Sequence, residues 1–197
     1  MPGNSKLDEV LESEYPRAVM DYETVREVVT DGTLVFFKAK TWGQKLISWI
    51  TNGEFSHCGI CTWVIDSLGQ KRLMLLESTS GGCRLVNLSS YMGREARLID
   101  INLAWEIIAK SATDKAGVIK YSPFDFVIIG LKDIMLSLGL KKFAECLPNT
   151  KGEVCSEFLA SLIWESGMGI EDVLVSPQDL YDAILSSGWI HREAWVK

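Results

Sequence analysis

The feature that most constrains the fold of this chain is a pair of β-rich runs joined by a short polar turn. Residues 57–65 and 72–79 are rich in β-branched and aromatic or aliphatic residues, and residues 66–69 form a turn between them. This pattern predicts one β-hairpin. Centring it on the second turn residue places His57 directly opposite Glu77, and centring it on the third places Glu77 diagonally. In both registers the two side chains lie on one face, with Cβ atoms roughly 5 to 8 Å apart.

The rest of the chain alternates predicted strands and helices, which indicates a mixed α and β fold. Ser176 and Pro177 are typical of a helix N-cap and first helical position, and Gly188 ends that helix. Residues 1–29 are expected to form an N-terminal arm or helix, and residues 30–197 one domain. Strands are expected at 33–38, 84–88, 98–101 and 189–196, and further helices at 41–51, 105–116 and 124–140.

Composition excludes several classes of protein. With 197 residues and 47% hydrophobic content, the chain is long enough for one well-buried domain. A net charge of −6 argues against a nucleic-acid partner, because nucleic-acid affinity rests on clustered Lys and Arg. The N-terminus lacks the apolar core of a signal peptide, and five cysteines without framework spacing indicate a reducing, cytoplasmic location. The apolar stretch 124–140 carries charges and is too short for a transmembrane span.

Cys155 is expected in the first turn of a helix. It precedes an apolar helical face that closes at Gly167, and it shares that stripe, so it faces the sheet. Unpaired backbone N–H groups and the helix dipole stabilise a thiolate at such a position, and the cysteine's own amide can supply one oxyanion donor. The residues of the face are Phe158, Leu159, Leu162 and Ile163.

Cys155, His57 and Glu77 together form a candidate catalytic triad. A thiol becomes a useful nucleophile when an imidazole takes its proton and a third polar group holds that imidazole in one tautomer. Taken singly, each residue has a simpler explanation: a small buried hydrophobe, a satisfied edge histidine and a carboxylate that ends its strand in water. Core packing alone does not explain why His and Glu share one face of a buried hairpin while a cysteine begins a helix.

The remaining cysteines and the second histidine are given no chemical role. Cys58 and Cys61 form a C-x-x-C, but residues three apart on a strand point to opposite faces, so their sulfurs cannot readily meet. With Cys83 and Cys146 they are interpreted as packing thiols, and no metal or cofactor site is expected. His191 lacks a matching carboxylate hairpin and ranks below His57.

Four segments in this order resemble the YiiX-like branch of the NlpC-type cysteine hydrolases. These enzymes are circularly permuted relatives of papain, in which His and its polar partner come from the sheet before the Cys-bearing helix. The resemblance spans residues 30–185 and implies an α+β, permuted papain-like fold with an antiparallel sheet packed against helices. The segments are Phe55-Ser56-His57-Cys58-Gly59-Ile60, Leu76-Glu77-Ser78, Cys155-Ser156-Glu157-Phe158 and Ser176-Pro177-Gln178-Asp179-Leu180.

By this resemblance residues 30–197 form a catalytic domain, with Cys155 as nucleophile, His57 as general base and Glu77 orienting it. The expected function is an amidase or peptidase that forms an acyl-enzyme, acting on a peptide, amide or lipid-ester substrate. Two alternatives stay open. One is lipid acyl transfer or thioester hydrolysis of the lecithin retinol acyltransferase type, for which the helix with Trp42 and Trp49 and the apolar 124–140 segment offer either an acyl site or ordinary core.

The other alternative is a non-catalytic interaction module with the same fold, for example a virion component. Two departures from the family bear on the substrate. A cysteine follows His57 where the family favours an aliphatic residue, and no export signal is seen. A peptidoglycan substrate is therefore expected only if a phage particle or lysis system delivers the protein.

Overall fold

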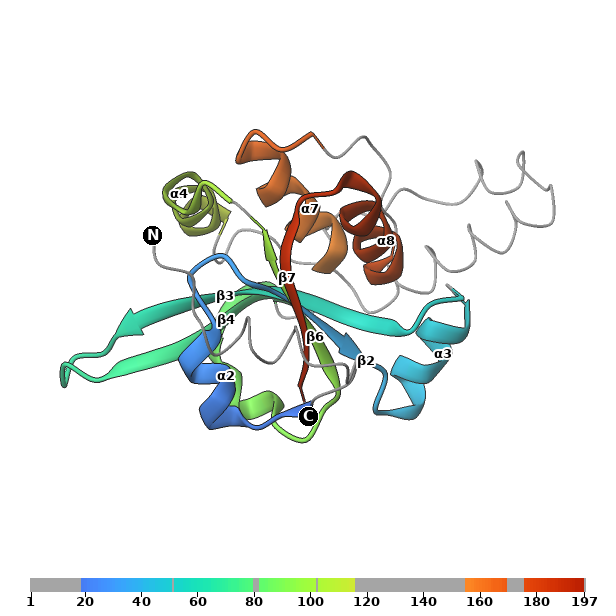
Figure 1. Cartoon of the computed structure of the whole chain (residues 1–197), viewed down its shortest axis with the longest axis horizontal. Coiled ribbons are helices and arrows are strands. Elements are labelled where there is room, and N and C mark those ends of the chain that lie inside the picture. The colour runs from blue at the N-terminus through green and yellow to red at the C-terminus, as the bar shows by residue number, and fades with distance from the viewer. Residues whose placement is uncertain are drawn as a thin grey trace.

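A seven-stranded sheet forms the centre of the protein, which is described here from a computed structural model (Figure 1). The structure describes residues 19–50, 52–79, 82–101, 103–115, 155–169 and 176–196. The strands are β1 (Val19–Met20), β2 (Leu34–Lys38), β3 (Phe55–Ile65), β4 (Lys71–Thr79), β5 (Gly82–Asn87), β6 (Ala96–Ile101) and β7 (Ile190–Val196). Their order across the sheet is β1-β7-β6-β2-β3-β4-β5. Neighbours pair antiparallel throughout, except that β1 and β7 pair parallel.

Helices cover both faces of this sheet (Figure 1). One face carries α2 (Tyr22–Val28), and the other carries α4 (Trp105–Lys115), α7 (Cys155–Glu165) and α8 (Pro177–Ser187). Helix α3 (Trp42–Ile50) connects β2 to β3, and a 3₁₀ helix, η1 (Leu88–Tyr91), follows β5. This is the α+β architecture, an antiparallel sheet packed against helices, that the sequence indicates.

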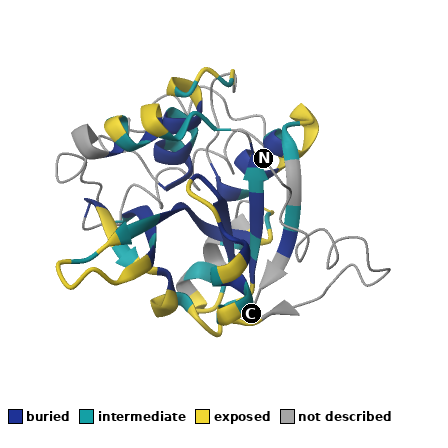
Figure 2. Ribbon diagram, turned by 60° about the vertical axis from the view of Figure 1, so that its left-hand side comes forward, coloured by how far each residue is buried: buried dark blue, intermediate teal, exposed yellow. Residues whose placement is uncertain are grey.

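The core divides into two clusters because strand side chains alternate between the faces of the sheet. The strands at the centre are accordingly buried, and exposed residues gather at turns and helix surfaces (Figure 2). The α7-side cluster consists of Leu34, Phe36, Phe55, Cys58, Ile60, Leu76, Cys83, Ile99, Ile101, Ile108, Ala112, Cys155, Phe158, Leu159, Leu162, Ile163, Leu180, Tyr181 and Ile184. The α2-side cluster consists of Val25, Val28, Val29, Val35, Phe37, Cys61, Leu73, Leu75, Leu88, Ala96, Leu98 and Ala194.

The predicted hairpin is present as β3 and β4, and its register settles the choice left open by the sequence. Ile60 pairs with Leu76 and Ile65 with Lys71, so the hairpin is centred on Leu68. The diagonal placement of Glu77 relative to His57 is therefore correct, and the directly opposite placement is wrong.

Local sequence signals also place the last helix correctly. Ser176 caps α8 by accepting a hydrogen bond from the Asp179 N–H, while the Asp179 side chain accepts from the Ser176 N–H. Pro177 begins the helix, and Gly188 ends it in a left-handed conformation with φ of 73°. The helix expected at 124–140 lies outside the described residues.

The described part of the N-terminal arm belongs to the same sheet and core. Strand β1 pairs with β7, and Val25 and Val28 of α2 are buried in the α2-side cluster. Helix α2 lies within this segment, and the division of the chain at residue 29 into an arm and a domain stays a prediction. Among the described helices, none combines the length and apolar character that crossing a bilayer requires.

Candidate active site

The candidate site lies where strands β3 and β4 separate. Their pairing runs as far as Ile60 and Leu76, although β3 begins earlier, at Phe55, and β4 continues to Thr79. On its other side β3 stays paired with β2, with a bulge opposite Phe37 and Lys38. Helix α7 packs on both β3 and β4. The first turn of α7 therefore approaches the point at which the two strands part.

Gly59 permits the close approach of β3 to β4 next to this opening. A Cβ atom at this position would lie 2.7 Å from the Leu76 carbonyl oxygen and 2.9 Å from a Leu75 methyl carbon. Such distances are well inside van der Waals contact, so any side chain here forces the two strands apart. The glycine of the Ser-His-x-Gly-Ile segment is thus required by packing.

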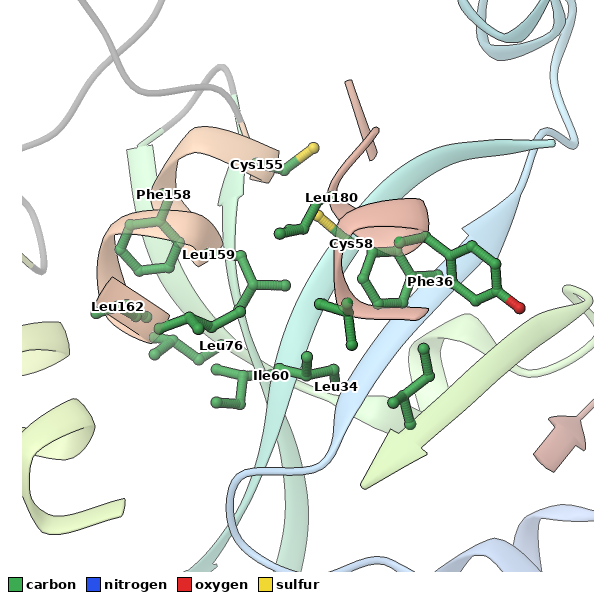
Figure 3. Packing of buried hydrophobic residues seen from close by; sticks show 14 of the residues in the cluster. Leu34, Phe36, Cys58, Ile60, Leu76, Cys155, Phe158, Leu159, Leu162 and Leu180 are labelled. Carbon is green, nitrogen blue, oxygen red and sulfur yellow. The ribbon is translucent and has the colours of Figure 1, made fainter. Parts of the chain in front are cut away.

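Cys155 is the first residue of α7 and is fully buried. Its side chain lies against β3 near Cys58, at the end of the helix whose Phe158, Leu159 and Leu162 fill the α7-side cluster (Figure 3). A hydrogen bond from the Cys58 thiol holds the pKa of Cys155 well below its ordinary value, and the charge and hydrogen bond of His57 and the Cys58 backbone N–H act in the same direction. Burial opposes them. The net result favours a thiolate.

His57 is held between the thiol and a carboxylate. Its Nε2 lies 2.5 Å from Oε2 of Glu77, which leaves Nδ1 as the ring nitrogen available to the thiol. Burial by itself lowers the pKa of His57, but the charge and hydrogen bond of Cys155, followed by those of Glu77, raise it to about 9. The ring is nearly parallel to those of Phe37 and Tyr91, with interplanar angles of 19° and 18°. The directions of these two pKa shifts favour an imidazolium next to a thiolate.

Glu77 is fully buried and accepts hydrogen bonds from three side chains. Besides its contact with His57, its Oε1 accepts from Nε of Arg84 at 2.8 Å and forms an ion pair with Nη2 of the same side chain at 2.8 Å, and its Oε2 accepts from the Tyr91 hydroxyl at 2.5 Å. Burial would raise the pKa of Glu77, but these partners, His57 first, hold it below the ordinary value. The alternative that Glu77 ends its strand in water is wrong.

The three predicted residues meet across the strand separation rather than on one face of the sheet. Phe37 and Tyr91, which stack on each other beside the His57 ring, pack with the α2-side cluster, whereas Cys155 belongs to the α7-side cluster. The ladder between β3 and β4 ends at Ile60 and Leu76, next to His57 and Glu77 in the sequence. The parity argument explains how His57 meets Glu77, but not how either meets Cys155.

Sequence reasoning missed Arg84, Tyr91 and the role of Cys58. Arg84 is the cross-strand partner of Glu77 in the β4–β5 pair, which alternation along a longer meander would have suggested. Tyr91 comes from η1, and its position depends on the path of the chain after β5, for which the sequence has no local signal. Cys58 is a core thiol as expected, yet it also lowers the pKa of Cys155.

The other residues considered from sequence lie elsewhere. Cys58 and Cys61 belong to opposite clusters, as strand alternation predicts, and Cys83 is buried in the α7-side cluster. His191 is on β7, which is separated from β3 by β6 and β2. Cys146 lies outside the described residues. In the part of the chain that the structure describes, no group of three or more His, Cys, Asp or Glu side chains is arranged to hold a metal ion.

Helix α3, which was considered for an acyl site, has two tryptophans that are exposed rather than buried. Trp42 and Trp49 are 80% and 75% exposed. Ordinary core packing therefore does not account for these two side chains. The second half of that suggestion, the 124–140 segment, lies outside the described residues.

No family model matches the chain, and no curated protein matches it. Among solved structures it is similar to the crystal structure of metalloprotein YiiX from Escherichia coli O157:H7, a DUF1105 protein. The TM-score is 0.49 and the identity 17%, over 85% of this chain and 87% of that one. No residue of this chain takes its role from that likeness.

Proposed function

We propose that this protein is a cysteine hydrolase that forms an acyl-enzyme on Cys155, with His57 as acid and base and Glu77 orienting the imidazole. One observation carries the proposal. A cysteine at a helix start, with its pKa lowered, lies against an imidazole whose pKa is about 9 and whose other nitrogen is bonded to a buried carboxylate. A thiolate paired with an imidazolium is the arrangement that a nucleophilic cysteine needs.

The reaction follows from this arrangement. The Cys155 thiolate attacks the carbonyl carbon of an amide or ester, and the resulting oxyanion is stabilised by the Cys155 backbone N–H at the start of α7. His57 then donates its proton to the leaving amine or alcohol as the bond to the carbonyl carbon breaks. Water next attacks the thioester and His57 takes a proton from that water. The C–S bond then breaks, which releases a carboxylic acid and restores the Cys155 thiolate beside the His57 imidazolium.

The chain order of the residues supports a permuted papain-like catalytic domain as part of this proposal. His57 and Glu77 come from a sheet that precedes the Cys-bearing helix, as in the permuted relatives of papain that the motifs resemble. Peptide, amide and lipid-ester substrates all contain the carbonyl carbon that this chemistry requires. Because Cys155 is fully buried and the His57 side chain is 11% exposed, a substrate reaches the thiol only after covering side chains move aside.

Trapping of the acyl-enzyme tests the proposal. The reduced protein is mixed with activated esters of short peptides and of fatty acids, quenched with acid and digested with trypsin. The acyl mass is expected on the peptide 152–192, which carries Cys155. Cys155→Ala should abolish the adduct, His57→Ala should slow its formation severely because the pair works as a unit, and Cys61→Ser should match the wild type.

The outcomes separate the three functions considered. Release of the acyl group to water supports the hydrolase, whereas its release only to an added amine or lipid acceptor supports acyl transfer. An adduct that forms equally on Cys155→Ala shows that the thiol is not the nucleophile. If Cys155→Ala keeps full biological activity in the native setting, the protein is not a cysteine hydrolase and the interaction-module hypothesis replaces the enzyme hypothesis.

A further inference from the structure

We propose that Cys58 and Cys155 form a reversible disulfide when the protein meets a hydroperoxide, with Cys155 as the oxidised thiol and Cys58 as the resolving thiol. This inference concerns regulation of the site described above and takes its functional meaning from the proposed function. The disulfide itself depends on the placement of the two sulfurs.

The placement rests on contacts between two elements that are far apart in the sequence. Cys155 is the first residue of α7 and Cys58 lies on β3, and α7 packs against β3. The Cys58 thiol and backbone N–H both act to lower the pKa of Cys155, as groups close to its sulfur do. Figure 3 shows the two side chains as neighbours in the α7-side cluster. Disulfide formation requires this kind of approach between facing elements.

The two thiols differ in reactivity in the way that such a pair requires. A peroxide oxygen is attacked by a thiolate, and the partners of Cys155 favour its thiolate form. Burial, and after it the hydrogen bond and charge of Cys155, raise the pKa of Cys58 well above its ordinary value, so that this residue stays a neutral thiol. The first oxidation is therefore expected at Cys155.

The chemistry balances in two steps. The Cys155 thiolate attacks the hydroperoxide, the O–O bond breaks, and a sulfenic acid forms, while the other oxygen takes a proton from the His57 imidazolium and leaves as alcohol or water. The negative charge that disfavoured ionisation of Cys58 is now gone. The Cys58 sulfur then attacks the Cys155 sulfur, the S–O bond breaks, and the Cys58 proton leaves with the hydroxide as water. Two thiols have been oxidised and one peroxide reduced.

The result is a closed state of the active site that reducing agents reverse. A disulfide removes the nucleophile without consuming it, because a dithiol regenerates both cysteines. It also withdraws Cys155 from further oxidation to the irreversible sulfinic and sulfonic acids. Cys61 cannot replace Cys58, because it points to the opposite face of the same strand.

Peptide mapping after mild oxidation tests this inference. The native full-length protein is treated with one equivalent of hydrogen peroxide, its remaining thiols are blocked with N-ethylmaleimide in denaturant, and it is digested without reduction. The tryptic peptide 46–71 contains both Cys58 and Cys61, so the assignment is made in the Cys61→Ser variant. A peptide 46–71 linked to 152–192 is expected as the main oxidised product, and dithiothreitol should restore both free thiols.

The variant Cys58→Ser gives the complementary result. Without a resolving thiol, Cys155 should proceed to sulfinic and sulfonic acid, and dithiothreitol should not recover it. Absence of the linked peptide from folded wild-type or Cys61→Ser protein in which Cys155 has been oxidised overturns the inference. Should Cys58→Ser fail to fold, as judged by near-ultraviolet circular dichroism, the mapping of the Cys61→Ser protein decides alone.

The same experiments keep this inference distinct from the proposed function. If the protein forms the linked peptide on oxidation but never an acyl adduct when reduced, the proposed disulfide is correct and the proposed hydrolase activity is wrong. If the protein forms the acyl adduct on Cys155 but no link to Cys58, the proposed hydrolase activity is supported and the proposed disulfide is wrong.

Discussion

Replacing Cys155 by alanine is expected to lower the pKa of His57. In the intact protein this pKa rises from 6.5 to about 9, although burial lowers it, and among the groups that raise it the charge of Cys155 comes first and Glu77 second. At 1.36 kcal/mol for each pKa unit, the rise corresponds to about 3 kcal/mol in favour of the imidazolium. Without the thiolate, Glu77 alone opposes burial. We expect the pKa of His57 to fall by at least one unit, which is about 1.4 kcal/mol.

The chain makes this measurement simple, because it contains two histidines. A pH titration of the ring Cε1–H signals by NMR gives one curve for each, and a His191→Asn variant identifies the curve of His57. At pH 8 the wild-type His57 should be mostly protonated. The same ring in Cys155→Ala should have lost more of its proton at that pH.

A control and a clear refutation accompany the titration. Cys61→Ala removes a buried thiol from the opposite face of β3 and should leave the His57 curve unchanged. If His57 titrates near 6.5 in the wild type, or if Cys155→Ala and the wild type give the same curve, the thiolate–imidazolium pair does not exist and the mechanism built on it is wrong.

Three further predictions concern the thiols and the packing around them. Limited iodoacetamide treatment at neutral pH should label Cys155 before Cys58 and Cys61, because burial raises the pKa of both of these thiols; equal labelling by mass spectrometry contradicts this. Tyr91→Phe removes a hydrogen bond to a buried carboxylate and should lower the free energy of unfolding in urea by about 1.5–3 kcal/mol. Gly59→Ala should lower the same quantity by about 1–3 kcal/mol through overpacking, whereas Gly169→Ala, with open space around it, should change it by less than about 0.5 kcal/mol.

Those parts of the fold that depend on neighbouring residues in sequence could be predicted from it. The hairpin turn, the Ser176 cap and the helix start at Cys155 each follow from residues within a few positions of one another. The hairpin register could not be chosen, since a shift of the centre by one position keeps His57 and Glu77 on one face. The register of the hairpin is selected by the simultaneous pairing of β3 with β2 and with β4.

The candidate site could be predicted in its members but not in its geometry. Side-chain alternation relates His57 to Glu77, yet it contains no information on where two paired strands separate. The carboxylate's other partners, Arg84 and Tyr91, depend on the return of β5 and on η1. The contact between Cys58 and Cys155 joins a strand to a helix far along the chain, so no local pattern could reveal it.

The dependence of the His57 pKa on the charge of Cys155 has a consequence for the timing of the proposed reaction. Before attack, the negative sulfur keeps the imidazole protonated, so the ring is ready to act as an acid toward the leaving group. Once the sulfur has become a neutral thioester, that charge is gone and burial is opposed by Glu77 alone. The ring, which has given its proton to the leaving group, therefore stays neutral more readily and is available as a base toward water. His57 thus acts first as an acid and then as a base, because formation of the thioester on Cys155 lowers the pKa of the imidazole that must next activate water.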